Sequence, residues 1–152
     1  MKKPIRLVVF TLDDQRYALR LSAVERVVRA VEVTPLPQAP EIVLGVINVQ
    51  GQVVPVVNVR RRFGLPEREM GLSDQIILAR TFRRAVALVV DAVEGGVACS
   101  EGGVSPSEEI LPGLAYIEGV LKLEDGMILI HDLDKFLSLD EEKVLDEAMR
   151  KG

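Results

Sequence analysis

One stretch of the sequence, VINVQGQVVPVVNV from Val46 to Val59, limits the possible folds of this chain most strongly. It is almost wholly aliphatic and is interrupted at Gln50-Gly51, so it predicts a β-hairpin that turns there. Pro55 has no N–H to donate to a strand ladder, and we expect its nitrogen to face an open sheet edge or a bulge. None of these side chains is a nucleophile, a general base or a firm metal ligand. The stretch therefore predicts an apolar sheet with an edge that is exposed or covered by another chain.

The composition narrows the class of partner. The chain has 152 residues, enough for one domain or two small fused subdomains. Hydrophobic residues make up 48% of it but aromatic residues only 4%, which argues against a surface that stacks nucleic-acid bases. The net charge of −4 gives no strong field for polyanions. We therefore expect no nucleic-acid partner.

The sequence also indicates a compartment. Cys99 is the single cysteine, so no internal disulfide can form, and a reducing compartment fits. The basic start is followed by an apolar run from Leu7 to Phe10 that is too short for a signal peptide. No apolar run approaches the roughly 20 residues of a membrane span. We expect a cytoplasmic, soluble protein that does not insert into a membrane.

Strands are expected along most of the remaining chain. The patterns predict strands at Arg6–Leu12, Arg16–Leu21, Gln75–Arg80 and Arg84–Val93, and a hairpin from Tyr116 to Leu133 with its turn at Asp125-Gly126. The segment from Glu94 to Glu109 carries four glycines and predicts a loop with one short strand at Val97–Ser100.

Two capping boxes predict helices. Ser22 with Glu25 predicts a short helix that ends near Arg29, and Ser138 with Glu141 opens a C-terminal helix. The apolar stripe of that last helix would be Leu139, Val144, Leu145 and Ala148. Pro40 could begin a turn of helix over residues 41–44.

The chain contains an apparent internal duplication. RYALRLSAVERV lies over RAVALVVDAVEGG when Ala18 is set on Ala87. GVINVQGQVVPVVNV lies over GVLKLEDGMILIHDL without a gap, so that Gly45 meets Gly119. The duplication favours two related β-subdomains, small closed barrels with a groove between them as a docking site. The alternative is that any two half-buried hairpins look alike.

Reactive constellations are absent from the sequence. His131 is the only histidine, and its place in a strand indicates a structural role. No second histidine or cysteine exists to complete a zinc site, and the motifs of serine hydrolases, zinc proteases and P-loop proteins are missing. We therefore expect no enzymatic activity, no metal and no cofactor, and a function in binding.

Several segments together resemble a known family. They are LVVFTL, YALRLSAVERVVRA, TPLPQAPEIVLGVINVQGQVVPVVNVRRRFG, VALVVDAVEGG and YIEGVLKLEDGMILIHDLDKFL, in that order. This series resembles the CheW family of chemotaxis coupling proteins over Ile5 to Leu137, and its most specific part is the block PxAPxxxxGVIN…G…VPVVNV.

The resemblance implies a fold and a role. The fold would be mainly β, two SH3-like five-stranded β-barrels packed together, with strands from both halves of the chain contributing, and with short helices and a C-terminal helix. The family domain would cover residues 1–138 and a helical tail residues 139–152. The role would be that of a cytoplasmic adaptor without enzymatic activity, recruited to membrane receptor arrays. It would join the tip of a chemoreceptor to the regulatory domain of the histidine kinase CheA.

This chain departs from the family pattern at two positions. The hairpin turn commonly reads Leu-Arg-Gly in the family and reads Val49-Gln50-Gly51 here. Arg26 stands where the family often has an acid. In relatives this region is tied to receptor binding, and charge at an interface sets specificity and on-rate. We therefore hypothesise that receptor choice differs in this chain, or that it serves another pathway.

The resemblance also suggests the residues of a receptor-binding groove, of which the valines are equally plausible as core. They are Val24, Arg26, Val27, Gly45, Ile47, Gln50, Gly51, Val89 and Val93. Three other functions stay open: an adaptor for a kinase pathway outside chemotaxis, a β-barrel that senses a small molecule, and a hydrolase with an unfamiliar site around His131 and Asp132.

Overall fold

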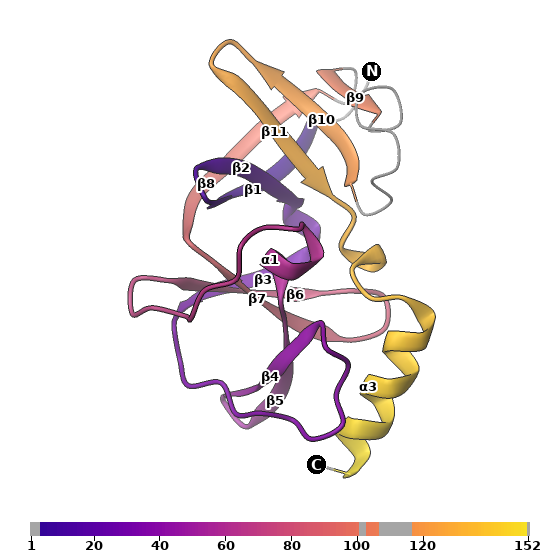
Figure 1. The fold of residues 1–152 in the computed structure, drawn as a ribbon. Coiled ribbons are helices and arrows are strands. Elements are labelled where there is room, and N and C mark those ends of the chain that lie inside the picture. The colour runs from indigo at the N-terminus through magenta and orange to yellow at the C-terminus, as the bar shows by residue number, and fades with distance from the viewer. Residues whose placement is uncertain (1–3, 101–102, 107–116, 152) are drawn as a thin grey trace.

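The computed structural model describes residues 4–100, 103–106 and 117–151 (Figure 1). Its strands are β1 (Pro4–Leu12), β2 (Gln15–Arg20), β3 (Val24–Arg29), β4 (Val43–Val49), β5 (Gln52–Val57), β6 (Gln75–Arg80), β7 (Ala85–Val90), β8 (Ala92–Ser100), β9 (Val104–Pro106), β10 (Ile117–Leu123) and β11 (Gly126–His131). Its helices are η1 (Leu21–Ala23), α1 (Val59–Arg62), η3 (Leu133–Lys135) and α3 (Leu139–Lys151).

The strands form two sheets that exchange strands between the two halves of the chain. One sheet has the order β8-β1-β2-β11-β10-β9 and the other β3-β6-β7-β5-β4. Figure 1 shows the two sheets as an upper and a lower subdomain, with α3 alongside the lower one. The predicted fold class, mainly β in two subdomains with short helices and a C-terminal helix, is confirmed, although one sheet has six strands rather than five.

The pairing of the strands repeats the duplication seen in the sequence. Ala18 in β2 lies beside Ile130 in β11, in a parallel ladder. Ala87 in β7 lies beside Val56 in β5, also in a parallel ladder. The sequence alignment sets Ala18 on Ala87 and Val56 on Ile130, so equivalent positions meet in both sheets.

Irregular features of the fold are duplicated as well. The β4–β5 ladder shifts register between Val43 and Gly45, and the β10–β11 ladder shifts between Ile117 and Gly119. These two pairs are equivalent in the alignment. A repeated bulge at equivalent positions is a specific feature, because bulges bend a strand at one defined place. The alternative that the two hairpins look alike by chance does not account for it.

The core has three parts, one in each sheet and one between the sheets. Successive side chains of a strand point to opposite faces, so one strand can serve two cores. In β6, Ile77 and Ala79 belong to the shared core, whereas Ile76 and Leu78 belong to the core of the lower subdomain. The shared core also takes Leu145 of α3.

The helix predicted after Ser22 is wrong. Only the short η1 lies there, and residues 24–29 form β3, which pairs with β6. The β-branched residues Val24, Val27 and Val28 favour a strand, and the backbone hydrogen bonds of β6 decide the outcome.

The C-terminal helix begins as its capping box predicts. The N–H of Glu141 donates to Ser138 Oγ, and the N–H of Ser138 donates to Glu141 Oε1. The predicted apolar stripe is only half right. Leu145 and Ala148 are buried, whereas Leu139 is 66% and Val144 44% exposed.

Two predictions in residues 34–59 also need correction. The helix predicted over residues 41–44 is reduced to a single turn: the N–H of Val43 donates to the carbonyl of Pro40 at 2.9 Å, and β4 begins at Val43. Pro55 is buried on β5, which lies between β4 and β7 rather than at an edge. Proline has no backbone N–H to donate, and it fits here because the pairing of β5 with β7 begins one residue later, at Val56.

Two predictions in the second half are wrong in detail. The strand predicted at Val97–Ser100 is present, but it is part of the longer β8 (Ala92–Ser100), because pairing along β1 outweighs the low strand propensity of Gly95 and Gly96. The last hairpin turns at Glu124-Asp125, and Gly126 already pairs with Leu123. Tyr116, residues 101–102 and residues 107–109 of these predictions lie outside the described residues. None of the helices in the described part of the chain is long and apolar enough to cross a membrane.

Candidate functional site

The apolar residues predicted to form one groove are divided between two separate cores. Val24 and Val27 of β3 pack against the core shared by the two subdomains, and so does Val93 of β8. Ile47, only 2% exposed, belongs to the core of the lower subdomain instead, and Val89 packs against that core. These five apolar residues therefore do not share one open groove.

Gly45 is buried, and its role is structural because the backbone of Thr34 lies close to it. A Cβ at this position would lie 2.3 Å from the carbonyl oxygen of Thr34. Thr34 and Val46 exchange two backbone hydrogen bonds, of 2.9 and 2.8 Å, which hold the preceding segment against β4. Only glycine permits this approach.

Arg26 and Gln50, in contrast, are brought together. Both line a pocket of about 210 Å³ at one end of the lower subdomain, with Glu25, Gln52 and Val54 among its other residues. Both side chains are exposed. Because the residues on either side of this pocket come from β3 and from the β4–β5 turn, a partner seated there would contact both elements.

The turn that carries Gln50 is rigidly defined. Gln50 has a φ of 51° and Gly51 a φ of 88°, as in a two-residue turn with both central residues in the left-handed region. The N–H of Gly51 donates to Asn48 Oδ1 at 2.8 Å, which fixes the turn from inside. The neighbouring Glu25 pairs with Arg80 at 3.6 Å. Arg26 makes no ion pair within the described ranges, so its charge is available to a partner.

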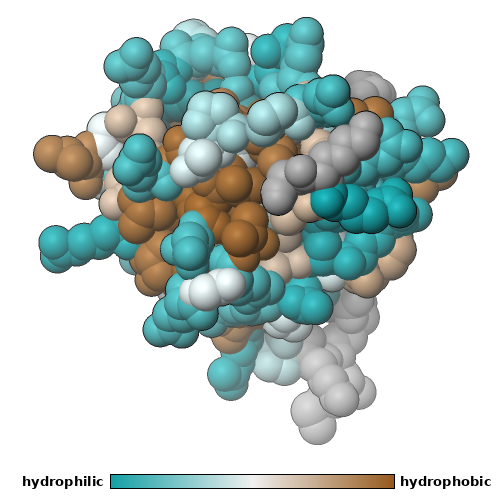
Figure 2. Space-filling model, turned by 90° about the horizontal axis from the view of Figure 1, so that it is seen from below, coloured by the Kyte–Doolittle hydropathy of each residue, from teal (hydrophilic) through white to brown (hydrophobic). Residues whose placement is uncertain are grey.

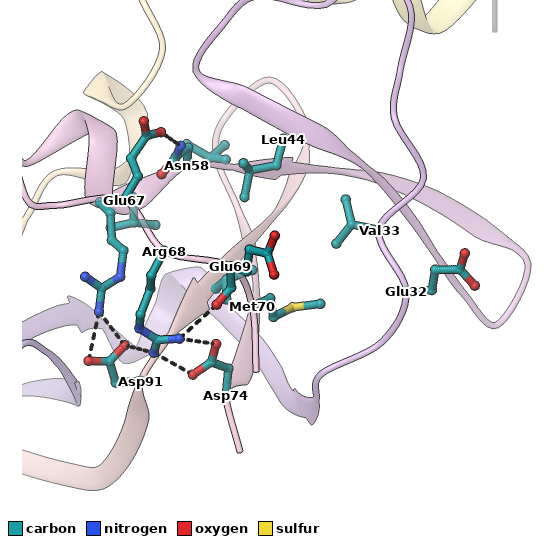
Figure 3. A pocket seen from close by; sticks show the side chains of 14 residues that line it. Glu32, Val33, Leu44, Asn58, Glu67, Arg68, Glu69, Met70, Asp74 and Asp91 are labelled. Carbon is teal, nitrogen blue, oxygen red and sulfur yellow. Dashed lines mark hydrogen bonds and ion pairs between the residues drawn. The ribbon is translucent and has the colours of Figure 1, made fainter. Parts of the chain in front are cut away.

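A second, larger cavity of about 700 Å³ lies at the lower sheet and contains a network of charges (Figure 3). Arg60 Nη2 donates to Asp91 Oδ1 at 2.8 Å and to Asp13 Oδ1 at 2.9 Å. Arg68 Nη2 donates to Asp74 Oδ1 at 2.7 Å and also to Asp91. Asp13 lies in the β1–β2 turn of the upper sheet, so the network joins the two subdomains.

The pKa values of the central carboxylates reflect this network. Burial by itself raises the pKa of Asp91, but the hydrogen bonds from the Asp13 N–H, Arg60 and Arg68 outweigh it and lower the pKa below its usual value. The pKa of Asp74 is lowered in the same way, against burial, by Arg68 and the N–H of Gly71. Both groups therefore stay ionised and serve as structural anchors rather than as acids or bases.

His131, the residue on which the hydrolase alternative depends, lies in an apolar environment. It is 2% exposed, with its ring centroid 3.9 Å from that of Phe63 and 5.1 Å from that of Phe136. Burial lowers the pKa of His131 to about 3, so the ring is neutral at neutral pH. Across the described ranges, no group of three or more His, Cys, Asp and Glu side chains is placed to hold a metal ion.

The end of the molecule at which β4 and β5 lie has an apolar centre. Figure 2, which looks at the molecule from below, shows hydrophobic side chains gathered in the middle of this face with hydrophilic ones around them. β4 and β5 contribute exposed apolar side chains, with Leu44 46% and Val53 51% exposed. Surfaces of this kind are typical of binding sites rather than of solvent-facing sheet.

Sequence reasoning missed the charge network. Arg60 belongs to a run of three arginines that is typical of a solvated strand end, yet its side chain is only 10% exposed. A usable signal was the position of Asp74 and Asp91, which stand directly beside the ends of the apolar strands β6 and β7. Their partners come from distant segments, and no sequence spacing indicates them.

Comparisons with known proteins agree on one family. The model of the CheW-like domain matches residues 6–141. The chemotaxis protein CheW of Rhizobium meliloti is 34% identical over 137 residues, which cover 89% of this chain and 88% of that protein. The chemotaxis protein CheW of Thermotoga maritima is 29% identical over 135 residues and 89% of each chain. The crystal structure of the scaffolding protein TtCheW from Thermoanaerobacter tengcongensis superimposes with a TM-score of 0.82 at 31% identity, over 91% of this chain and 96% of that one.

Proposed function

The chain belongs to the family of CheW-like domains, and on that premise we propose that it is a chemotaxis adaptor that couples chemoreceptors to the histidine kinase CheA. The observation that carries this proposal is the likeness to a scaffolding protein over 91% of the chain, with both subdomains included. The adaptor has no enzymatic activity of its own, works in the cytoplasm and is recruited to receptor arrays at the membrane. On this proposal its family domain is residues 1–138, followed by a helical tail of residues 139–152 that contains α3.

An adaptor needs surfaces rather than reactive groups, and two features of this chain supply them. The pocket beside Arg26 and Gln50 is polar and open at one end of the lower subdomain. The apolar centre of the face in Figure 2 lies at the β4–β5 end. Polar contacts set specificity and buried apolar contacts contribute most of the affinity in protein interfaces.

The receptor tip contacts the region around Arg26 and Gln50. Arg26 is exposed on β3, and no ion pair within the described residues neutralises it. A carboxylate on the receptor would pair with Arg26, whereas relatives with an acid there would repel it. The remaining predicted residues, Val24, Val27, Ile47, Val89 and Val93, support the shape of the two cores beneath this region.

Calorimetric titration of the full chain tests the proposal. The kinase regulatory domain and receptor-tip fragments from the same cell are titrated separately. Heat of binding to both supports the coupling role. If the chain binds the kinase domain but no chemoreceptor tip, the altered charge at Arg26 and Gln50 favours the second candidate, an adaptor for a kinase pathway outside chemotaxis. If it binds neither, the adaptor proposal is wrong.

A further inference from the structure

The turn between β4 and β5 holds a residue in an uncommon backbone conformation. Gln50 has a φ of 51° and Gly51 a φ of 88°, and Val49 pairs with Gln52 on either side of them. Asparagine, aspartate and glycine are the residues that favour the first central position of such a turn, and glutamine is not among them. Residues held in sparsely populated conformations gather at functional sites. The conformation of Gln50 therefore needs a physical cause and points to a function.

The side chain of Asn48 supplies the cause. Its Oδ1 accepts a hydrogen bond from the N–H of Gly51 at 2.8 Å. In a tight turn the backbone hydrogen bond joins the two flanking residues, so the N–H of the second central residue has no partner in the strand ladder. Asn48 gives this N–H a partner. The bond requires the N–H to point toward Asn48, and so it favours the turn that the structure shows.

The duplicated hairpin of the upper subdomain provides an internal comparison. The gap-free alignment sets Asn48 on Lys122 and Gln50 on Glu124. A lysine side chain has no acceptor, so Lys122 cannot make the same hydrogen bond. Glu124 and Asp125, the central residues of that turn, are also not among the described residues with a positive φ. The asparagine and the left-handed turn thus occur together in one hairpin and are both missing from its counterpart.

The conformation of the turn decides where the Gln50 side chain points. The direction of a side chain depends on the backbone angles of its own residue, so a different turn would move Gln50 relative to the pocket that it lines with Arg26. Asn48 is exposed and does not line that pocket. Any effect of Asn48 on the pocket therefore passes through the turn.

We infer that Asn48 is a positioning residue for receptor recognition, because it holds the turn that presents Gln50 beside Arg26. The inference rests on the proposed function, in which the receptor tip contacts this pocket. It goes further by giving a role to a residue outside the pocket. A turn that already has its bound conformation loses less freedom on binding, and this strengthens the complex.

Two variants at one position test the inference. Asn48→Ala removes the acceptor, whereas Asn48→Asp keeps an acceptor oxygen. Hydrogen exchange of the Gly51 amide, followed by NMR, should be faster in the alanine variant and close to native in the aspartate variant. Calorimetry should show binding of the receptor tip weakened about three- to tenfold by alanine, as for the loss of one hydrogen bond, and largely restored by aspartate. Binding of the kinase regulatory domain should be unchanged in both variants.

Controls separate the turn from charge and from folding. Lys122→Ala changes an exposed residue at the equivalent place before the β10–β11 turn and should leave receptor binding unchanged. The charge that Asn48→Asp adds is screened by salt, so each variant is compared with the native chain at low and at high salt. Urea denaturation and kinase binding show that each variant is folded.

Three results would overturn the inference. An alanine variant that binds the receptor tip as tightly as the native chain does shows that the turn does not position Gln50 for the receptor. An aspartate variant that restores the slow exchange of Gly51 but binds as weakly as the alanine variant at both salt concentrations shows that Asn48 does not act through the turn. In both cases the native chain still binds, and the proposed function stands. A native chain that binds no receptor tip contradicts the proposed function, and the inference with it.

Discussion

Nη2 of Arg60 lies 2.8 Å from Oδ1 of Asp91, and this contact ties the helix after β5 to the junction between β7 and β8. The same guanidinium reaches Asp13 in the upper sheet, so one side chain holds three segments that are distant in sequence. Arg60 is only 10% exposed and Asp91 26%, which makes the pair more costly to break than a surface ion pair.

Asp91→Asn should therefore destabilise the fold. The amide removes the charge that pairs with Arg60 and Arg68 and leaves Arg60 partly buried without full compensation. We expect a loss of about 1–3 kcal/mol in the free energy of unfolding, measured by urea denaturation. Asp125→Asn breaks the exposed pair with Arg16 and is the control, for which we expect no measurable change. Equal effects of the two variants would contradict the importance of the Arg60 network.

The two capping boxes of the sequence give a matched pair of variants. Ser138 caps α3 in the structure, whereas residues after Ser22 form a strand. Ser138→Ala should cost about 1 kcal/mol in the free energy of unfolding, and Ser22→Ala should cost much less. Thermal or urea denaturation of both variants distinguishes them. A larger effect at Ser22 would mean that the helix predicted there does form.

The packing of α3 is tested by two neighbouring apolar residues. Leu145 is fully buried in the core shared by the subdomains, while Val144 is 44% exposed. Leu145→Ala should lower the free energy of unfolding by about 2–4 kcal/mol, because it opens a cavity. Val144→Ala should lower it by less than about 0.5 kcal/mol. Similar losses for both would show that the helix does not pack through the Leu145 face.

The capping boxes also show what sequence can and cannot decide. Ser22 and Ser138 open the same S-x-x-E pattern, but β-branched residues follow Ser22, and the pairing of β3 with β6 makes that segment a strand. Likewise Gly95 and Gly96 predict a loop, but β1 offers them a complete ladder. The hairpins, the duplication and the family could be predicted because they rest on local pattern. The Arg60 network could not, since it depends on contacts between distant segments.

His131 gives a prediction for the dependence of stability on pH. Its folded pKa of about 3 lies below the unfolded value of about 6.5, so the unfolded chain takes up the proton first as the pH falls. The stability is fully present above about pH 6.5 and is lost toward pH 3, with a slope of up to about 1.4 kcal/mol per pH unit. The lowered pKa values of Asp74 and Asp91 add to the loss only below about pH 4.

Urea denaturation between about pH 4.5 and 6.5 isolates the histidine from these carboxylates. The native chain should lose roughly 2 kcal/mol across that window, and His131→Leu should lose almost none. The leucine variant is the suitable control because it keeps an apolar side chain among Phe63 and Phe136. An unchanged slope in the variant would show that other groups titrate there.

The last prediction concerns the partner of the small pocket. Arg26 and Gln50 line it together. They stand where the family often has an acid and an arginine, respectively, and Arg26 makes no ion pair among the described residues. The double variant Arg26→Glu with Gln50→Arg restores an acid and a base at these positions. Its fold should survive, because an exposed pair contributes only about 0–1 kcal/mol. Its preference among receptor-tip fragments should change, since charge at an interface selects the partner and affects the association rate.

Binding is measured by calorimetry for each fragment, with kinase binding as the internal reference. Arg29→Glu on the same strand is the control, because Arg29 does not line the pocket. If the double variant binds every receptor tip as the native chain does, the pocket beside Arg26 does not select the receptor.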